Sequence, residues 1–343
     1  MQKNRLIALF AVTAIVVVAA VALTVTGGGP TAERGAGERV APQLAYRIGD
    51  VATITVARAQ GAFNLARQAD GGWGVAEKSN YPADMAKVRQ TVLGMAELTL
   101  VEPKTAKPDS YPRLEVEDAG KEGAKSTLLT LKDGSGGKLA ELIVGKRRVD
   151  RLGTGVDGVY IRRPGEAQSW LAKGTLDLAP DAKDWLDKKV AAIEAKRIKS
   201  VTLVQPDGAK VVLQRDNPEA KFAVADAPDG AKMKSDYTVS EPASTLDNLE
   251  LTDVQPEASL PFPAEGVNQA ELVTFDGLTV KVRVLEKDGT NWIRLAASGT
   301  GDAEKEAKAF NDKVSPWVYA VAPYKANPLK TKMADLIEQP KSS

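Results

Sequence analysis

The chain has 343 residues, of which 43% are hydrophobic, and this length predicts two domains that each bury a core. Its 46 basic residues balance 45 acidic ones, so we expect no nucleic-acid partner. The chain lacks cysteine and histidine, which excludes disulfides, thiol nucleophiles, lipid attachment at cysteine and the usual zinc ligands. We therefore expect a non-enzymatic protein with no catalytic, cofactor-binding or metal site.

An uncharged apolar run covers residues 6–26. At about 1.5 Å per residue a helix over this run spans roughly 31 Å, enough to cross a bilayer, and Lys3 and Arg5 before it favour a cytoplasmic N-terminus. The run predicts a single-pass anchor in the bacterial cytoplasmic (inner) membrane, with the C-terminal region outside the cytoplasm, in the periplasm. Ala20-Val21-Ala22 has the small-x-small form, so a cleaved secretory signal is the alternative, and it exports the same region.

Alternating apolar residues predict strands after a linker over residues 27–44. The run from Val51 to Val56 alternates, and the pattern continues through Phe63, Leu65 and Trp73 across glycine turns. Further strands are predicted at residues 128–131, 139–144, 159–162 and 169–172. Hairpin turns of the Asp-Gly type separate strands in this part of the chain, so we expect an α+β class with mainly antiparallel sheets and a few helices.

One amphipathic helix is predicted between these strands. Met85, Val88, Val92 and Met95 recur at spacings of three and four, and Asp84 stands where an N-terminal cap is expected.

The same order of elements occurs twice. Residues 97–103 read ELTLVEP and residues 250–256 read ELTDVQP, with five of seven positions identical. Later strands are expected at residues 201–204, 211–213, 272–275, 280–285 and 292–295. We infer a tandem duplication. The predicted domains are a cytoplasmic N-terminus over residues 1–5, the anchor over 6–26, the linker over 27–44, a first α+β repeat over 45–180, a connecting segment over 181–197, a second α+β repeat over 198–325 and a C-terminal tail over 326–343.

Several segments together carry a likeness to a known family. They are the anchor, the Trp73 strand followed by Tyr81-Pro-Ala-Asp84 and its helix, Tyr111-x-x-Leu114, Val159-Tyr-Ile-Arg162 and Asp184-Trp-Leu-Asp187. With these segments the chain resembles the bacterial domain of unknown function 4340 over most of residues 45–325. The resemblance implies an envelope protein associated with ABC-type export systems related to gliding machinery, and it implies no catalytic residue.

The densest basic cluster is the candidate contact site. It contains Lys146, Arg147, Arg148 and Arg151, which could contact anionic lipid, an acidic glycan or the acidic patch of a partner. Asp150 dilutes its charge, so a solvated loop is the alternative interpretation.

Two further patterns leave other functions open. Glu115, Glu117 and Asp118 could pair as the carboxylates of a hydrolase. Exposed tryptophans could stack on sugar rings, although their apolar surroundings favour a place in the core; they are Trp73, Trp170, Trp185, Trp292 and Trp317. The function that we expect is an accessory or scaffold subunit of a membrane complex, such as an ABC-type exporter. The alternatives are a module that binds cell-wall glycan and a hydrolase that uses carboxylates alone.

Overall fold

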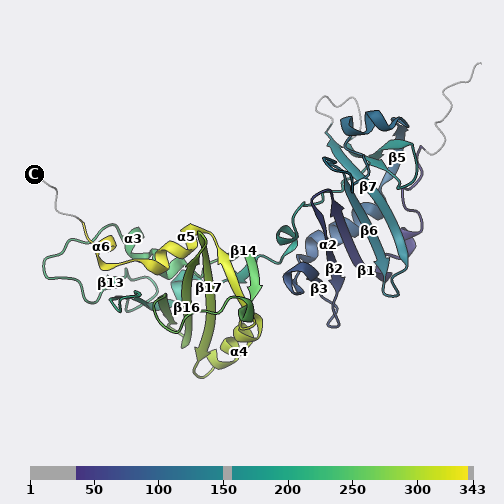
Figure 1. Cartoon of the computed structure of the whole chain (residues 1–343). Coiled ribbons are helices and arrows are strands. Elements are labelled where there is room, and N and C mark those ends of the chain that lie inside the picture. The colour runs from purple at the N-terminus through teal and green to yellow at the C-terminus, as the bar shows by residue number, and fades with distance from the viewer. Residues whose placement is uncertain (1–35, 150–156, 339–343) are drawn as a thin grey trace, which may run out of the picture. The chain divides into compact units, whose positions relative to one another are not determined.

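The computed structural model describes residues 36–149 and 157–338 (Figure 1). The chain divides into two compact units. Its described residues form two nine-stranded sheets with few helices, so the predicted α+β class with mainly antiparallel sheets is confirmed. The predicted anchor, residues 6–26, lies outside the described residues. Within residues 36–149 and 157–338, no helix is long and apolar enough to cross a bilayer.

The first sheet has the strand order β4-β3-β2-β1-β6-β7-β8-β9-β5. Its strands are β1 (Val51–Arg58), β2 (Gly61–Arg67), β3 (Trp73–Val75), β4 (Tyr81–Pro82), β5 (Thr99–Pro103), β6 (Thr127–Asp133), β7 (Lys138–Arg148), β8 (Gly158–Arg162) and β9 (Ser169–Lys173). Antiparallel pairing joins β1 to β6, β6 to β7, β7 to β8, β8 to β9 and β9 to β5. The strands β1 to β4 and β6 to β9 therefore form two meanders that the β1–β6 pair joins, and β5 pairs with β9 at the outer edge.

The second sheet has the strand order β10-β14-β18-β17-β16-β15-β11-β12-β13. Its strands are β10 (Lys189–Ala191), β11 (Ile198–Val204), β12 (Lys210–Gln214), β13 (Ala223–Val224), β14 (Leu249–Pro256), β15 (Asn268–Thr274), β16 (Leu278–Lys287), β17 (Thr290–Gly299) and β18 (Trp317–Val321). Alternation gives this sheet one apolar face, because along β16 buried Val280, Val282 and Val284 alternate with the more exposed Lys281 and Arg283.

The two strand orders correspond. Starting at β3, the first sheet runs 3-2-1-6-7-8-9-5, and starting at β13 the second runs 13-12-11-15-16-17-18-14. Strands that follow one another in the same sequence order therefore occupy the same relative places in both sheets. The strands β4 and β10 have no counterpart in this comparison and lie at outer edges.

The helix α2 (Met85–Glu97) forms where the apolar spacing predicts it. Val88, Val92 and Met95 are buried, and the Asp84 carboxylate accepts hydrogen bonds from the backbone N–H groups of the first turn, at 2.8 Å for Ala86. The predicted cap is therefore present.

The other α-helices of the described residues belong to the second half of the chain and were not predicted. They are α3 (Asp236–Ser240), α4 (Ala303–Val314), α5 (Pro323–Ala326) and α6 (Met333–Leu336). The longest of them, α4, packs against β17 and β16 (Figure 1). Its buried side is formed by Ala303, Ala307 and Val314, and two alanines give too weak an apolar stripe to stand out from the surrounding charges.

Short 3₁₀ helices occupy many of the connections. They are η1 (Leu44–Tyr46), η2 (Ile48–Asp50), η3 (Ala76–Lys78), η4 (Pro108–Arg113), η5 (Ala182–Trp185), η6 (Ala195–Arg197), η7 (Glu241–Ser244), η8 (Glu257–Ser259) and η9 (Asn327–Lys330).

Two segments outside the predicted repeats take part in the second unit. The connecting segment, residues 181–197, contains β10, which pairs with β14. The described part of the predicted C-terminal tail, residues 326–338, packs onto this unit because Leu329 and Leu336 are buried, and the carbonyl of Thr331 accepts a hydrogen bond from the Gln205 side chain at 2.9 Å. Burial of these two leucines removes apolar surface from water.

Three tryptophans lie in the core, as their apolar surroundings predict. Trp73, Trp185 and Trp292 are at most 8% exposed, whereas Trp170 and Trp317 are half-buried.

Candidate binding sites

The predicted basic cluster begins at a bulge in β7. The register between β7 and β8 shifts after Val144, and Gly145 and Lys146 occupy the irregular stretch. A Cβ atom on Gly145 would lie 2.3 Å from the carbonyl oxygen of Leu114, so only glycine allows the segment at residue 114 to cross the strand this closely. The backbone N–H of Lys146 donates to that same carbonyl at 3.1 Å.

The charges of this cluster differ in their surroundings. Lys146 and Arg147 are exposed, and neither forms an ion pair with another described residue. Arg148 lies 3.5 Å from the Glu102 carboxylate. Arg151 lies outside the described residues. Among the predicted contact residues, Lys146 and Arg147 are therefore the ones that present unpaired charge on β7.

One of the predicted carboxylates, Asp118, lies against a buried arginine. Arg162 is 4% exposed; its guanidinium forms an ion pair with Asp118 and donates from Nε to the carbonyl oxygen of Val116 at 2.8 Å. The same guanidinium lies over the ring of Tyr111, 4.6 Å from its centre. Through this ion pair Asp118 holds the segment after η4 against β8. One carboxylate oxygen of Glu117 is buried and has no hydrogen-bond partner among the described residues.

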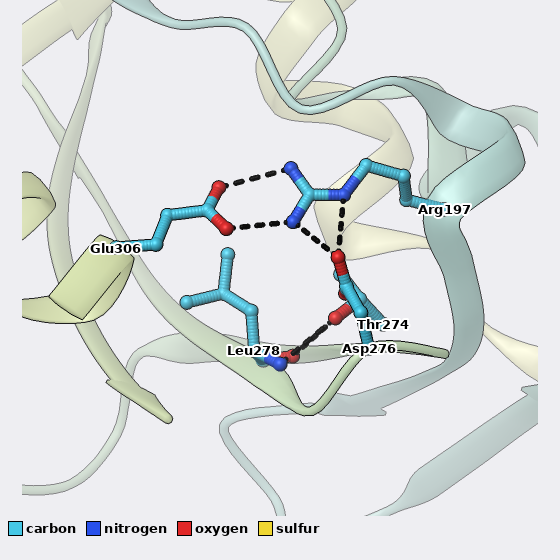
Figure 2. Close-up of polar contacts among 5 residues, drawn as sticks. All are labelled: Arg197, Thr274, Asp276, Leu278 and Glu306. Atoms are coloured by element: carbon cyan, nitrogen blue, oxygen red, sulfur yellow. Dashed lines mark hydrogen bonds and ion pairs between the residues drawn. The ribbon is translucent and has the colours of Figure 1, made fainter. Parts of the chain in front are cut away.

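A second charged cluster, which we call the Arg197 clamp, consists of Arg197, Asp276 and Glu306 (Figure 2). Arg197 ends η6; its Nη1 and Nη2 donate to the two carboxylate oxygens of Glu306 on α4 at 2.9 and 2.7 Å. Its Nε and Nη2 also donate to one oxygen of Asp276 at 3.1 and 2.7 Å. This forked geometry is specific to arginine.

The clamp fixes a tight turn between β15 and β16. The Thr274 hydroxyl accepts from the backbone N–H of Leu278 at 2.9 Å, and the backbone N–H of Phe275 donates to the carbonyl of Arg197 at 2.9 Å. Hydrogen bonding to the Thr274 hydroxyl and then to Arg197 lowers the pKa of Asp276. Hydrogen bonding to Glu306, and secondly to Asp276, raises the pKa of Arg197.

An arginine–aspartate pair recurs at the corresponding place in the first sheet. Arg47 precedes β1 and donates to the Asp133 carboxylate at 3.1 Å, in the turn between β6 and β7. The Asp133 carboxylate also accepts from the Ser135 hydroxyl at 2.7 Å and from the backbone N–H of Gly137 at 2.8 Å. These hydrogen bonds, led by that from Ser135, lower the pKa of Asp133 to about 2. In strand order β1, β6 and β7 correspond to β11, β15 and β16.

A hollow of about 330 Å³ opens beside η6 in the second unit and is a candidate ligand site. The residues that we use to define this η6 hollow are Lys196, Arg215, Lys221, Phe222, Asp236 and Tyr237. They come from η6, from the segment after β12 and from the start of α3.

Backbone carbonyls hold Arg215 in the wall of the η6 hollow. Its Nε donates to Ile198 at 2.8 Å, its Nη1 to Pro218 at 2.7 Å and its Nη2 to Ala195 at 2.7 Å. Each of these partners is a carbonyl oxygen, and no described carboxylate forms an ion pair with Arg215.

Aromatic rings flank the same guanidinium. Its central carbon lies 4.5 Å from the ring centre of Phe222 and 5.8 Å from that of Phe275, distances at which a cation is attracted to an aromatic face. Burial lowers the pKa of Arg215, and the charge of Glu219 opposes this effect. The group remains charged near neutrality because an arginine pKa lies far above that range.

The family relationship rests on one match. The model of the domain of unknown function DUF4340 matches residues 73–266, which is more than half of the chain. The chain belongs to the DUF4340 family. No curated protein and no solved structure gives a significant match to it. In this DUF4340 protein the matched stretch begins at β3 and ends between β14 and β15, so it includes strands of both sheets.

The DUF4340 match includes some of the site residues and omits others. Inside it lie Lys146, Arg147, Arg148, Arg197 and Arg215. Asp276 and Glu306, which hold Arg197, lie beyond it. The clamp of this DUF4340 protein is therefore completed by residues outside the matched stretch.

Sequence reasoning missed both Arg197 and Arg215. Asp-Gly pairs at residues 133–134 and 276–277 mark the two turns that an arginine holds. The same pair also occurs at residues 70–71, 157–158, 207–208, 229–230 and 288–289, so it does not single these turns out. No motif marks Arg215, since its partners are backbone carbonyls that any residue can supply.

Proposed function

We propose that the chain is a single-pass protein of the bacterial cytoplasmic membrane whose exported, tandemly duplicated region is a non-enzymatic accessory or scaffold subunit of a membrane complex, such as an ABC-type exporter. The proposed address is the periplasmic side of the membrane. The proposed partners are the membrane itself and subunits of the transporter.

The observation that carries this proposal is the repeated strand order of the two sheets. The repeated phrase at residues 97–103 and 250–256 and the arginine–aspartate pair at corresponding turns support an origin by duplication. Two linked copies of one domain offer two related surfaces on a single chain. Such linkage raises the effective concentration of the second binding event once the first has occurred, which suits a subunit that joins other proteins.

The apolar run over residues 6–26 supports the membrane attachment. It carries no charge, and its length suits a bilayer-spanning helix. Attachment to the membrane would keep the two sheets near an integral partner, which lowers the entropic cost of association.

The exposed charges of Lys146 and Arg147 support a partner-binding surface on the first sheet. Neither is neutralised by a described carboxylate, so an acidic patch on a partner could pair with both. Charges of this kind raise association rates and select partners, and their effect declines with salt.

Membrane topology is tested first, and the absence of native cysteine makes this simple. Single-cysteine variants Gln2→Cys and Tyr324→Cys are treated in spheroplasts with a membrane-impermeant maleimide; Tyr324 is 70% exposed. We expect labelling of Tyr324→Cys in intact spheroplasts and of Gln2→Cys only after permeabilisation. Equal labelling of both in intact spheroplasts would contradict the orientation. The intact mass of the extracted protein shows whether the N-terminal run has been cleaved.

The partner is tested by crosslinking in cells, gentle detergent extraction and mass spectrometry at native abundance. The variant Lys146→Glu/Arg147→Glu is compared with Lys121→Glu/Lys125→Glu, a matched reversal of two exposed lysines in the same half of the chain. We expect transporter subunits with the wild type and the control, and recovery at least about fivefold lower with the first variant. Recovery of the protein alone would count against the scaffold role, and equal recovery from both variants would count against this surface.

A further inference from the structure

The η6 hollow contains a cation, Arg215, that forms no ion pair with a carboxylate among the described residues. The Arg215 guanidinium has five N–H donors, and three of them are used by the carbonyls of Ala195, Ile198 and Pro218. Two donors are left, and no described carboxylate is paired with the group. The charge of Glu219 acts on Arg215 without a direct ion pair. Since a partly buried charge without a paired counter-charge is costly, an anion in the hollow would complete this arrangement.

The rim of the hollow adds two exposed cations. Lys196 lies 2.8 Å from the carboxylate of Glu194 and Lys221 lies 2.5 Å from that of Asp236. The lysine side chains are 71% and 76% exposed, so these pairs contribute little to stability and exchange readily with solvent ions. Either lysine can therefore turn to an incoming anion at small cost, and Asp236 is then left to accept a hydrogen bond from the ligand.

Aromatic and hydroxyl groups complete the lining. Tyr237 is 75% exposed and lines the hollow together with Phe222, so a flat ligand face can lie against an aromatic surface. Ser240 and Ser244 also line it, and their oxygens can accept hydrogen bonds from ligand hydroxyl groups. The volume of about 330 Å³ is at the small end for ligand sites and suits one substituted ring.

We propose that the η6 hollow binds a small acidic saccharide, whose anionic group contacts Arg215 and whose ring lies against Tyr237. The anion is a carboxylate or a phosphate; both accept forked hydrogen bonds from arginine. This site goes beyond the proposed function, because it requires neither the membrane partner nor the basic cluster on β7.

The test is ligand-observed saturation-transfer NMR on the full chain in detergent micelles. The probes are glucuronic acid, glucose 6-phosphate and glucose. We expect both acidic sugars to bind at least about tenfold more tightly than glucose and to weaken as salt rises. The tighter acidic sugar identifies the anion. Equal binding of glucose, or no transfer to either acidic sugar at about 20 mM, would overturn the proposal.

Variants locate the binding. Tyr237→Ala is compared with Tyr324→Ala, which removes a tyrosine of similar exposure, 70% against 75%, elsewhere in the second unit. We expect Tyr237→Ala to weaken glucuronic acid or glucose 6-phosphate binding at least about fivefold and Tyr324→Ala to change it less than about twofold. Wild-type affinity in Tyr237→Ala would place the ligand elsewhere and refute the site.

The arginine is tested by Arg215→Lys, which keeps the charge but loses the fork and should weaken binding about tenfold. Its folding is checked by circular dichroism. If Arg215→Lys does not fold, Lys221→Gln on the exposed rim takes its place, with an expected loss of about threefold. An unchanged affinity in the variant used would contradict recognition of the anion by this hollow.

Discussion

The Arg197 clamp allows a quantitative test, because one side chain joins two carboxylates that are distant in sequence. We consider Arg197→Gln and Glu306→Gln, alone and together, since glutamine keeps most of the packing and removes the charge. Arg197 makes four hydrogen bonds, two to Glu306 and two to Asp276. Its side chain is 28% exposed, against 43% for Glu306 and 54% for Asp276.

The exposure of the three groups limits the effect. Exposed pairs contribute about 0.2–1 kcal/mol, and a forked pair within a network lies at the upper end. We therefore expect a coupling free energy of about 1 kcal/mol between Arg197 and Glu306, and a total loss of about 1–2 kcal/mol in Arg197→Gln, which also loses Asp276. For a unit of this size the loss lowers Tm by about 2–8 °C.

The assay is urea unfolding of the whole chain, with hydrogen exchange of peptides from α4 reporting on the second unit. A double-mutant cycle gives the coupling, measured at about 0.05 M and about 1 M NaCl, where screening should reduce it. The control cycle uses Lys308 and Asp312, a single pair 2.7 Å apart on α4 with side chains 77% and 64% exposed, for which we expect at most about 0.5 kcal/mol. A clamp coupling no larger than the control, or one insensitive to salt, would refute the reasoning.

Three further outcomes are expected. The pKa of Asp133 is about 2 and should rise toward the ordinary aspartate value in Ser135→Ala, which carboxyl-carbon NMR can follow. In the wild type the ionised Asp133 carboxylate stabilises the fold at pH values above the ordinary aspartate pKa. That contribution to stability disappears as the pH falls through about 2. Gly145→Ala should cost about 1–3 kcal/mol, because the new Cβ meets a carbonyl oxygen at 2.3 Å, whereas Gly120→Ala, with nothing within 4 Å, should cost far less in the same thermal unfolding assay. Arg162→Met should destabilise the chain by about 1–3 kcal/mol, because it removes the hydrogen bonds to the carbonyl oxygens of Val116 and Glu166, and it should expose residues 108–118 to limited proteolysis; unchanged proteolysis would show that this arginine does not hold the segment.

Local patterns in the sequence predict much of the fold. Val280, Val282 and Val284 alternate with polar residues, and a strand is the conformation that places all three on one face. Val88, Val92 and Met95 follow the helical spacing, and Asp84 caps the helix that they form. These signals act over a few residues, so they are readable without knowledge of the rest of the chain.

The same local character explains which elements were missed. On α4 the buried side chains are Ala303, Ala307 and Val314. They are small, and charged residues lie between them in the sequence, so the apolar pattern of a helix is hard to recognise. The strand β18 is five residues long and becomes recognisable through its pairing with β14 and β17. Short or weakly apolar segments take their structure from neighbours that are distant in sequence.

The sequence by itself determined the apolar run at residues 6–26, the α+β class and the basic cluster at Lys146 and Arg147. Only the tertiary structure brought Arg197 to Asp276, 79 residues away, and to Glu306, 109 residues away. It also placed Arg215 among carbonyls beside Phe222. The physical reason is that side-chain chemistry and local periodicity are encoded position by position, whereas a site is made by strand pairing and helix packing that join remote segments.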